Sequence, residues 1–328
     1  MSKFKRFLAI FLLLSFLGLP HLFAADLQVH FIDVGQGDSI FIVAPSGKKI
    51  LIDAGIHPGE KDKWNPFNYI RGLKQDGKID NLQIDYVILT HPDRDHYVGF
   101  SYLCSKHKEE DDFSIANFYY SIYEPKEPKE TDKFWQCLQS LKPKTRDLGQ
   151  ISARGPPIDI GEDIEFTILL PFENLTIASK TKNDDSVVSR LGYKQVSFLF
   201  TGDAPTKVEK TLLDKDIQTN VLKVGHHGSK YSSDEEFLRK LKPDSGDFYA
   251  VISSNYHDGL GRKYGHPHKE TLQRLKALGG ANLYRTDLHG TIIFKTDGLS
   301  INVETQKKDI PEEKLWKPGR VLTDQPKR

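Results

Sequence analysis

Thr90-His91-Pro92-Asp93-Arg94-Asp95-His96 is the stretch of this chain that says most about its fold. It directly follows Ile84-Asp85-Tyr86-Val87-Ile88-Leu89, an apolar, β-branched run that predicts a buried strand. The proline and the charges cannot continue that strand, so the polar side chains are expected on a loop at its carboxyl end. Two imidazoles and two carboxylates set so close together favour a hydrolytic metal site over an exposed polar loop.

Four further motifs place acidic or imidazole side chains just beyond an apolar run, and each contains a glycine. They are Asp33-Val34-Gly35-Gln36-Gly37-Asp38, Asp53-Ala54-Gly55, Thr201-Gly202-Asp203 and His226-His227-Gly228-Ser229. So many carboxylates would repel one another without a cation, and one or two divalent ions would relieve that repulsion. The plain structural alternatives are turns at the aspartates and an ordinary loop at the histidine pair. The turn interpretation stays open for Asp33 and Asp38.

A fifth motif, Tyr264-Gly265-His266-Pro267-His268, is a weaker signal. His268 either faces a substrate or simply begins a following helix. Lys230 and the Arg262-Lys263 pair flank the motifs. They could hold phosphate oxygens, although ordinary surface positions explain them equally well.

The rest of the chain forms two successive blocks of strands and helices. Strands are predicted over residues 27–32, 39–43, 49–52, 84–89, 164–170, 187–191, 196–200, 221–224, 248–252, 282–285, 290–294 and 299–303. Helices are predicted over residues 67–73, 205–213 and 268–278, and from the capping box Ser233-Asp234-Glu235-Glu236 to Leu241. Charged, proline-containing residues 106–132 predict an exposed insertion. Two such blocks favour an α/β fold in which two sheets pack together with helices outside.

Composition is that of an ordinary globular protein. The chain has 328 residues, of which 38% are hydrophobic, with 46 basic and 45 acidic residues. Residues 1–24 contain three basic residues and no acidic one, so without them the balance is 43 against 45, a net charge of −2. No global basic field directs this protein to nucleic acid, and any such contact must come from a local patch. Cys104 and Cys137 could pair or remain separate buried thiols.

Residues 1–24 have the features of a secretory signal peptide. Lys3, Lys5 and Arg6 precede an apolar run, and Leu22-Phe23-Ala24 offers a small residue for cleavage near Ala24. The run is short for a membrane span, although an uncleaved anchor is the competing interpretation. We therefore expect a secreted or periplasmic protein with no stable membrane span after cleavage.

The mature chain is expected to be one folded domain followed by a tail. Residues 25–305 would form the domain, and residues 306–328, rich in charge and proline, a loosely held C-terminal tail.

Taken together, the motifs resemble the metallo-β-lactamase superfamily, and within it the extracytoplasmic domain of ComEC-type competence proteins. The matching segments occur in family order and are Phe31–Ser39, Leu51–Gly55, Thr90–His96, Phe200–Asp203, Leu222–Lys230 and Tyr264–His268. This resemblance implies a four-layer αββα sandwich with a metal site at one edge of the sheets.

The resemblance also implies roles for individual residues. His91 and Asp93 would hold a first ion, Asp95 and His96 a second, and Asp203 would bridge the two. One of His226 and His227 would complete the second site, while the other faces the substrate. The position of His226 after Gly225 slightly favours it as the ligand, which leaves His227, with Asp95, among the catalytic residues. Supporting and substrate-facing roles would fall to a further set: Asp33, Asp38 and Asp53 behind the ligands, and Ser229, Lys230, His266 and His268 toward the substrate.

Two departures from the superfamily pattern affect the metal. Asp93 replaces the usual histidine, and Asn183-Asp184-Asp185-Ser186 stands where a separate histidine usually precedes the bridging aspartate. Asn183 or a neighbouring aspartate could supply an oxygen ligand, and the spacing does not select one. Both changes favour oxygen ligands, and therefore manganese over zinc or weak occupancy of the first position. One or two divalent ions, zinc or manganese, are expected.

The expected activity is metal-dependent hydrolysis with an activated water as nucleophile, as in a phosphodiesterase or nuclease. Two ions about 3.5–4 Å apart suit displacement at a phosphoester. The substrate would be a phosphoester, with DNA among the candidates, and no obligate protein partner is indicated. One alternative is an esterase of phosphocholine-type or other small phosphoesters, which the near-neutral charge suits equally. The other is a non-catalytic, metal-stabilised binding module, against which the complete ligand set argues.

Overall fold

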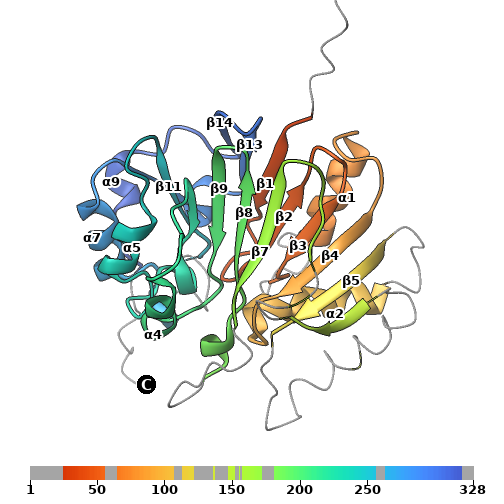
Figure 1. The fold of residues 1–328 in the computed structure, drawn as a ribbon, viewed down its shortest axis with the longest axis horizontal. Coiled ribbons are helices and arrows are strands. Elements are labelled where there is room, and N and C mark those ends of the chain that lie inside the picture. The colour runs from red at the N-terminus through yellow and green to blue at the C-terminus, as the bar shows by residue number, and fades with distance from the viewer. Residues whose placement is uncertain are drawn as a thin grey trace, which may run out of the picture.

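Two facing β-sheets with helices on both outer faces form the protein (Figure 1). The computed structural model describes residues 25–55, 65–106, 113–121, 136, 147–151, 155, 157–171, 181–255 and 263–319. The α/β, four-layer αββα sandwich expected from the sequence is therefore confirmed. The expected signal peptide, Cys137 and residues 320–328 lie outside the described residues.

Within the described chain, the first sheet has eight strands and is half parallel. In spatial order these are β14 (Ile301–Thr305), β13 (Ile292–Thr296), β1 (Leu27–Phe31), β2 (Ile40–Val43), β3 (Lys49–Ile52), β4 (Gln83–Leu89), β5 (Ser114–Tyr120) and β6 (Asp147–Gln150). Strands β3 to β6 run parallel to one another, and the other neighbours are antiparallel.

The second sheet, as far as it is described, has six strands. Their spatial order is β12 (Ala281–Arg285), β11 (Phe248–Ile252), β10 (Val221–Lys223), β9 (Val196–Phe200), β8 (Val188–Tyr193) and β7 (Ile164–Leu170). Strands β9 to β12 are parallel. The carboxyl ends of parallel strands meet at one edge of a sheet, so both sheets present such an edge.

Helices cover the outer faces. Those packed on the first sheet are α1 (Pro66–Gln75) and α2 (Arg94–Lys106) (Figure 1). On the side of the second sheet lie α4 (Thr206–Glu209), α5 (Glu235–Leu241), α7 (Lys269–Ala277) and α9 (Glu312–Leu315) (Figure 1). Short turns of helix are α8 (Thr286–His289) and the 3₁₀ segments η2 (Lys182–Asp185), η3 (Lys210–Leu212) and η4 (Gly225–Gly228). None of the described helices is long and apolar enough to cross a bilayer.

Three apolar layers hold the sheets and helices together. One lies between the sheets, where Phe31 of the first sheet meets Phe200 of the second at a ring distance of 6.3 Å. The second joins the first sheet to α1 and α2, and the third joins the second sheet to α4, α5 and α7. Truncating such a fully buried phenylalanine to alanine typically costs about 3–5 kcal/mol.

Strand β5 contradicts the prediction of an exposed insertion over residues 106–132. Ile115 and Phe118 are buried, and the strand lies between β4 and β6. Charged residues on both sides of this short apolar run concealed it in the sequence. Residues 107–112 and 122–135 lie outside the described part.

Residues 306–319 are not loosely held, which corrects the expectation for this part of the tail. The buried Arg285 donates from Nη1 to the carbonyl oxygens of Leu315 and Lys317, at 3.0 and 2.6 Å. Trp316 packs against the apolar layer beneath the helices of the second sheet, and Gly319 N donates to Pro267 O at 2.9 Å. A buried guanidinium that needs acceptors thus holds a segment whose composition suggested a loose tail.

Helix α5 begins close to the predicted position, but its cap differs. Asp234 is the N-cap, and its side chain accepts from Glu236 N at 3.1 Å. The carboxylate of the buried Glu209 accepts from Ser233 N at 2.5 Å and from Asp234 N at 3.0 Å. Two carboxylates therefore bind the first backbone N–H groups at this helix start.

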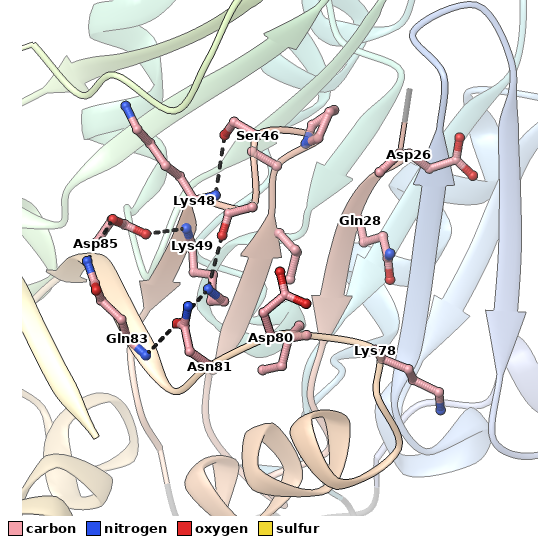
Figure 2. A pocket seen from close by; sticks show the side chains of 16 residues that line it. Asp26, Gln28, Ser46, Lys48, Lys49, Lys78, Asp80, Asn81, Gln83 and Asp85 are labelled. Carbon is pink, nitrogen blue, oxygen red and sulfur yellow. Dashed lines mark hydrogen bonds between the residues drawn. The ribbon is translucent and has the colours of Figure 1, made fainter. Parts of the chain in front are cut away.

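A cavity of about 430 Å³ lies where β3 and β4 begin, at the end of the first sheet opposite to the carboxyl ends of those strands (Figure 2). Its polar groups bind one another. Lys49 Nζ donates to Gly47 O at 3.0 Å and to Asn81 Oδ1 at 3.1 Å, and Asp85 Oδ2 accepts from Lys49 N at 2.8 Å. None of the motif residues lines it.

Candidate metal centre

The motif residues meet at the edge where parallel strands of both sheets end. Asp53 follows β3 and His91 follows β4 in the first sheet. Asp203 follows β9 and His227 follows β10 in the second sheet. The centre therefore lies between the two sheets, and each sheet contributes part of it.

Asp95 and His96 lie in the first turn of α2 rather than on a loop, which corrects the sequence expectation. The helix begins at Arg94, just after Pro92, and His96 N donates to Asp93 O at 3.0 Å. A carboxylate in a first helical turn is favoured by the positive end of the helix dipole. The histidine and aspartate that follow the proline are therefore fixed by helical geometry.

Two glycines make room for the backbone of Asp95. A Cβ atom on Gly37 would lie 2.4 Å from Asp95 O, and one on Gly55 would lie 2.2 Å from it. The same carbonyl accepts from Asp38 N at 3.1 Å. The glycines of two separate motifs thus hold the start of α2 in place.

Three buried side chains form the inner part of the centre. Nε2 of His91 lies 3.7 Å from Asp203 Oδ2, and Nε2 of His96 lies 3.4 Å from Asp203 Oδ1. Both Nε2 atoms and Asp203 Oδ1 are buried without a hydrogen-bond partner. Unpaired nitrogen and oxygen atoms that converge on one point are the donor set of a divalent cation, so these residues fit a metal.

A second group of possible ligands shares His96. It consists of Asp95, His96 and His227, whose ligand atoms lie within 4.8 Å of one another. Nε2 of His227 lies 3.2 Å from Asp95 Oδ2 and 3.6 Å from Asp203 Oδ2, and it has no hydrogen-bond partner. Asp203 thus faces both groups, as expected of a bridging ligand.

Asp53 supports this arrangement from behind. Its carboxylate accepts from Thr90 N, Thr90 Oγ1 and His96 Nδ1, each at 2.7 Å. The bond to Nδ1 aims Nε2 of His96 at Asp203. A carboxylate that orients an imidazole in this way is a common partner of a metal-binding histidine.

The first position has a weaker donor set. Asp93 is 36% exposed, and its Oδ1 pairs with Lys182 Nζ at 3.1 Å, while Oδ2 lies 3.7 Å from His91 Nε2. Among the described residues, Asp93 belongs to none of the compact groups that could hold an ion. The ammonium of Lys182 therefore stands beside the place where a first ion would bind.

The polar segment before β8 gives no clear additional ligand. Asn183 Nδ2 lies 3.4 Å from His226 Nδ1. Asp184 accepts from Thr181 N and pairs with Lys207 at 2.8 Å. Asp185 is buried, and its carbonyl accepts from Ser121 Oγ. Of these residues, Asn183 is the one whose side chain lies beside His226, so it is the candidate that we carry forward as an additional oxygen ligand.

The two neighbouring histidines differ in burial, and the difference runs against the sequence preference for His226 as the ligand. Both have left-handed backbones, with φ of 49° at His226 and 55° at His227. This strained turn buries His227 completely against the other ligands, whereas the side chain of His226 stays 27% exposed. The placement favours His227 as the metal ligand and His226 as the histidine that faces solvent.

Two further aspartates take different places. Asp38 is buried at the centre, where its Oδ1 lies 3.4 Å from His227 Nδ1 and its Oδ2 lies 2.7 Å from Lys223 Nζ. Asp33 Oδ1 accepts from Gly35 N at 3.2 Å, as in a turn, and Asp33 belongs to none of the compact groups found in the described residues. Lys223 and Thr90 were not singled out as functional from the sequence, although both lie within quoted motifs.

The expected substrate-facing residues form one rim beside the centre. The His266 ring lies 5.5 Å from that of His226 and 4.8 Å from that of His268, and His268 Nδ1 accepts from Lys230 N at 3.0 Å. Ser229 and His266 are both buried, and the hydroxyl of Ser229 accepts from Tyr231 N. Ser229 therefore shapes the loop rather than the open surface.

Two exposed tyrosines extend this rim. Tyr231 and Tyr264 are 65% and 46% exposed. The Nζ atoms of Lys230 and Lys263 lie 5.3 and 5.5 Å from the respective tyrosine rings, and Tyr264 stacks on His266. The rim thus combines flat aromatic faces with cations.

Mutual electrostatics keep the carboxylates of the centre ionised. Burial would raise the pKa of Asp203, but His227, His226 and His96 hold it well below the usual range. Burial would likewise lower the pKa of His227, but Asp203 and Asp38 raise it to about 10. Without metal, charged imidazoles balance the carboxylates, and a divalent cation would take over that role.

Comparison with known proteins agrees with this geometry. The model of the family described as the metallo-beta-lactamase superfamily matches residues 32–250. The chain is 34% identical over 287 residues to ComE operon protein 3 of Bacillus subtilis, covering 82% of this chain and 33% of that protein. It is 28% identical over 265 residues to competence protein ComA of Neisseria gonorrhoeae, covering 80% of this chain and 31% of that protein.

This chain therefore spans about a third of the length of these relatives. Among solved structures, the fold is similar to that of the metallo-beta-lactamase fold protein YhfI from Bacillus subtilis. The TM-score is 0.50 at 13% identity, with coverage of 83% of this chain and 100% of that chain.

Proposed function

The chain belongs to the metallo-beta-lactamase superfamily, and from that premise we propose that it is a metal-dependent phosphodiesterase. One observation carries the proposal. The Nε2 atoms of His91, His96 and His227 and an oxygen of Asp203 are buried, unpaired and directed at one another. A divalent ion held there would activate a water for attack and stabilise charge on phosphoester oxygens.

The proposed ligands divide between two positions. His96, Asp95, His227 and Asp203 would hold the second ion, and His91, Asp203 and Asp93 would hold the first. Because Asp93 is paired with Lys182, the first position has the lower affinity. Zinc or manganese would serve, with manganese favoured by the oxygen ligands.

His226 is the proposed proton donor. Its Nε2 lies 3.6 Å from Asp203 Oδ2, and its side chain is 27% exposed beside the rim. An imidazole at the boundary between the ligands and solvent can reach both a bound substrate and water. It would protonate the leaving oxygen, a contribution of about 10²–10⁴-fold in rate for a general acid.

The rim supports a nucleic-acid phosphodiester as substrate, in preference to a small phosphocholine-type ester. Bases stack on exposed aromatic rings, and Lys230 and Lys263 provide cations for the phosphates beside Tyr231 and Tyr264. Because the net charge of the chain is near zero, binding of nucleic acid needs a local basic patch, and the rim would provide it. We also propose that the protein is exported, because residues 1–24 have the charged, apolar and small-residue order of a signal peptide.

The test measures hydrolysis of a chromogenic phosphodiester and of single-stranded DNA by protein loaded with manganese or zinc. Asp203→Ala should abolish both activities, since it removes the bridging carboxylate, while Glu165→Gln on the exposed edge strand β7 should not. Activity that persists in Asp203→Ala would place the chemistry elsewhere. Added salt should reduce turnover of DNA steeply and that of the small ester little.

A further inference from the structure

Lys223 is completely buried at the end of β10, in the middle of the parallel part of the second sheet. Strands buried on both faces are normally apolar throughout, and an ammonium inside a protein is costly unless it is paired. Val221, on the same face, belongs to the apolar layer between the sheets, whereas Leu222 and Val224 belong to the helix-side layer. The lysine side chain therefore enters the space between the two sheets.

There it meets a carboxylate of the first sheet. Lys223 Nζ lies 2.7 Å from Asp38 Oδ2 and donates to Val224 O at 3.1 Å. The side chain of Asp38 is itself only 2% exposed. The pair thus joins the strand that leads to the histidine pair with the loop that precedes β2.

The second oxygen of Asp38 faces a proposed ligand. Asp38 Oδ1 lies 3.4 Å from Nδ1 of His227, and the same Nδ1 lies 2.9 Å from Ser253 O. A carbonyl oxygen can only accept, so Nδ1 carries a proton, and an ion that displaces the proton of Nε2 would bind the Nε2 lone pair. That lone pair points toward Asp95 and Asp203.

The backbone of Asp38 contacts another proposed ligand. Asp38 N donates to Asp95 O at 3.1 Å, and Gly55 N donates to Asp38 O at 2.8 Å. One residue therefore touches His227 with its side chain and Asp95 with its main chain. A shift of the Asp38 backbone would be transmitted to both.

Asp38 is also close enough to bind an ion itself. It forms compact groups with Asp203 and His227, and with Asp53 and His96. An ammonium 2.7 Å from one of its oxygens holds the carboxylate away from that role.

We propose that Lys223 is a positioning residue that acts through Asp38. It holds the Asp38 carboxylate beside His227 Nδ1 and the Asp38 N–H on the carbonyl of Asp95, and it keeps the carboxylate from becoming a ligand. The inference rests on the proposed metal-dependent function and adds to it a buried ammonium as a determinant of how the second ion is held.

A purely structural role of the Lys223–Asp38 pair predicts a different result. If the pair only joins the two sheets, replacing both partners with uncharged side chains should leave metal binding intact, because no uncompensated charge remains buried. If Lys223 positions Asp38, the same replacement should still weaken metal binding. Carboxylate partners of metal-binding histidines typically change the affinity about 10–100-fold.

The experiment compares the wild type with Lys223→Met, Asp38→Asn and the double variant. Metal affinity is measured by competition with a chromogenic chelator, the Co²⁺-loaded protein is examined by absorption spectroscopy, and unfolding of the metal-free protein is followed by denaturant. Lys295→Met, which breaks the remote pair of Lys295 and Glu304 on β13 and β14, is the control.

We expect the double variant to fold and to bind the ion at least about tenfold more weakly than the wild type. Its effect should be close to that of Asp38→Asn alone, because both act through one carboxylate. Lys223→Met should alter the Co²⁺ spectrum, since Asp38 is then free to coordinate. Wild-type affinity and spectrum in the double variant would overturn the positioning role and leave the proposed function standing, whereas a wild type that binds no metal would overturn both.

Discussion

Nδ1 of His96 lies 2.7 Å from Oδ2 of Asp53, at the junction of helix α2 and strand β3. The same carboxylate also accepts from the backbone and the hydroxyl of Thr90. One buried side chain therefore determines both where β4 ends and where His96 points.

We expect Asp53→Ala to reduce both stability and metal affinity. Each buried group left unpaired costs about 1–3 kcal/mol, and the lost imidazole partner should lower metal affinity about 10–100-fold. Asp53→Asn keeps an acceptor for Thr90 N, so it should recover much of the stability. It should not recover the metal affinity, because the carboxylate beside His96 is still missing. Denaturant unfolding of metal-free protein and chelator competition give the two quantities, and equal affinity in wild type and Asp53→Ala would contradict this role.

Alanine substitutions at His226 and at His227 should have different effects. His227→Ala should lose bound metal together with the stability that metal confers, because His227 is buried among the ligands. His226→Ala should keep its metal and melting temperature but lose turnover by about 10²–10⁴-fold. Elemental analysis and calorimetry of the two variants decide the matter. The reverse result would restore the preference suggested by the sequence.

Lys182 should weaken binding at the first position. Its ammonium lies 3.1 Å from Asp93 Oδ1, and a positive charge so close repels an incoming cation. Lys182→Met is therefore expected to raise the affinity for a second equivalent of metal by roughly tenfold, measured by titration calorimetry. Lys207→Met is the matched control, since Lys207 pairs with Asp184, which is outside the compact groups of the described residues. Unchanged stoichiometry and affinity in Lys182→Met would rule out this effect.

Glu209 predicts a pH dependence of stability that is independent of metal. Burial raises its pKa to about 7, from 4.5 in the unfolded chain. A raised pKa means that the folded state binds the proton of Glu209 more tightly than the unfolded chain does. Protonation of Glu209 therefore stabilises the fold fully below pH 4.5, and this stabilisation is lost as the pH rises through 7.

Glu209→Gln should remove the loss of stability that the wild type shows as the pH rises, because glutamine does not ionise. The free energy of unfolding of the variant relative to wild type should rise between pH 4.5 and 8, by an amount on the order of 3 kcal/mol. Denaturant titrations with chelator present measure it, and the exposed Glu165→Gln should show no such trend. A flat difference across this range would show that Glu209 titrates normally.

Much of this arrangement could be predicted from residue patterns, because apolar runs that end in a glycine and a carboxylate mark the ends of buried strands. That reasoning placed His91, His96 and Asp203 beyond the ends of strands, and the family resemblance implied that they share one edge, where the structure brings them together. It missed β5 because charged residues flank the strand, and it missed the start of α2 because a proline followed by charges also describes a loop.

The distinction between His226 and His227 was beyond sequence reasoning for a physical reason. Both belong to a left-handed turn, and which ring is buried depends on Ser253 and Asp38, which come from distant segments. In the sequence Lys223 is indistinguishable from any other strand residue, since nothing in β10 itself indicates an acceptor across the sheets. Long-range partners of this kind are set by how the two sheets dock.

The division of the proposed ligands between the sheets bears on how the protein matures. His91, Asp95 and His96 belong to the first half of the chain, and Asp203 and His227 to the second. A chain still emerging from the ribosome contains only part of the proposed ligand set, so it should bind divalent ions weakly. A divalent ion bound between the sheets would therefore be taken up only after both halves are present, and it would resist their separation.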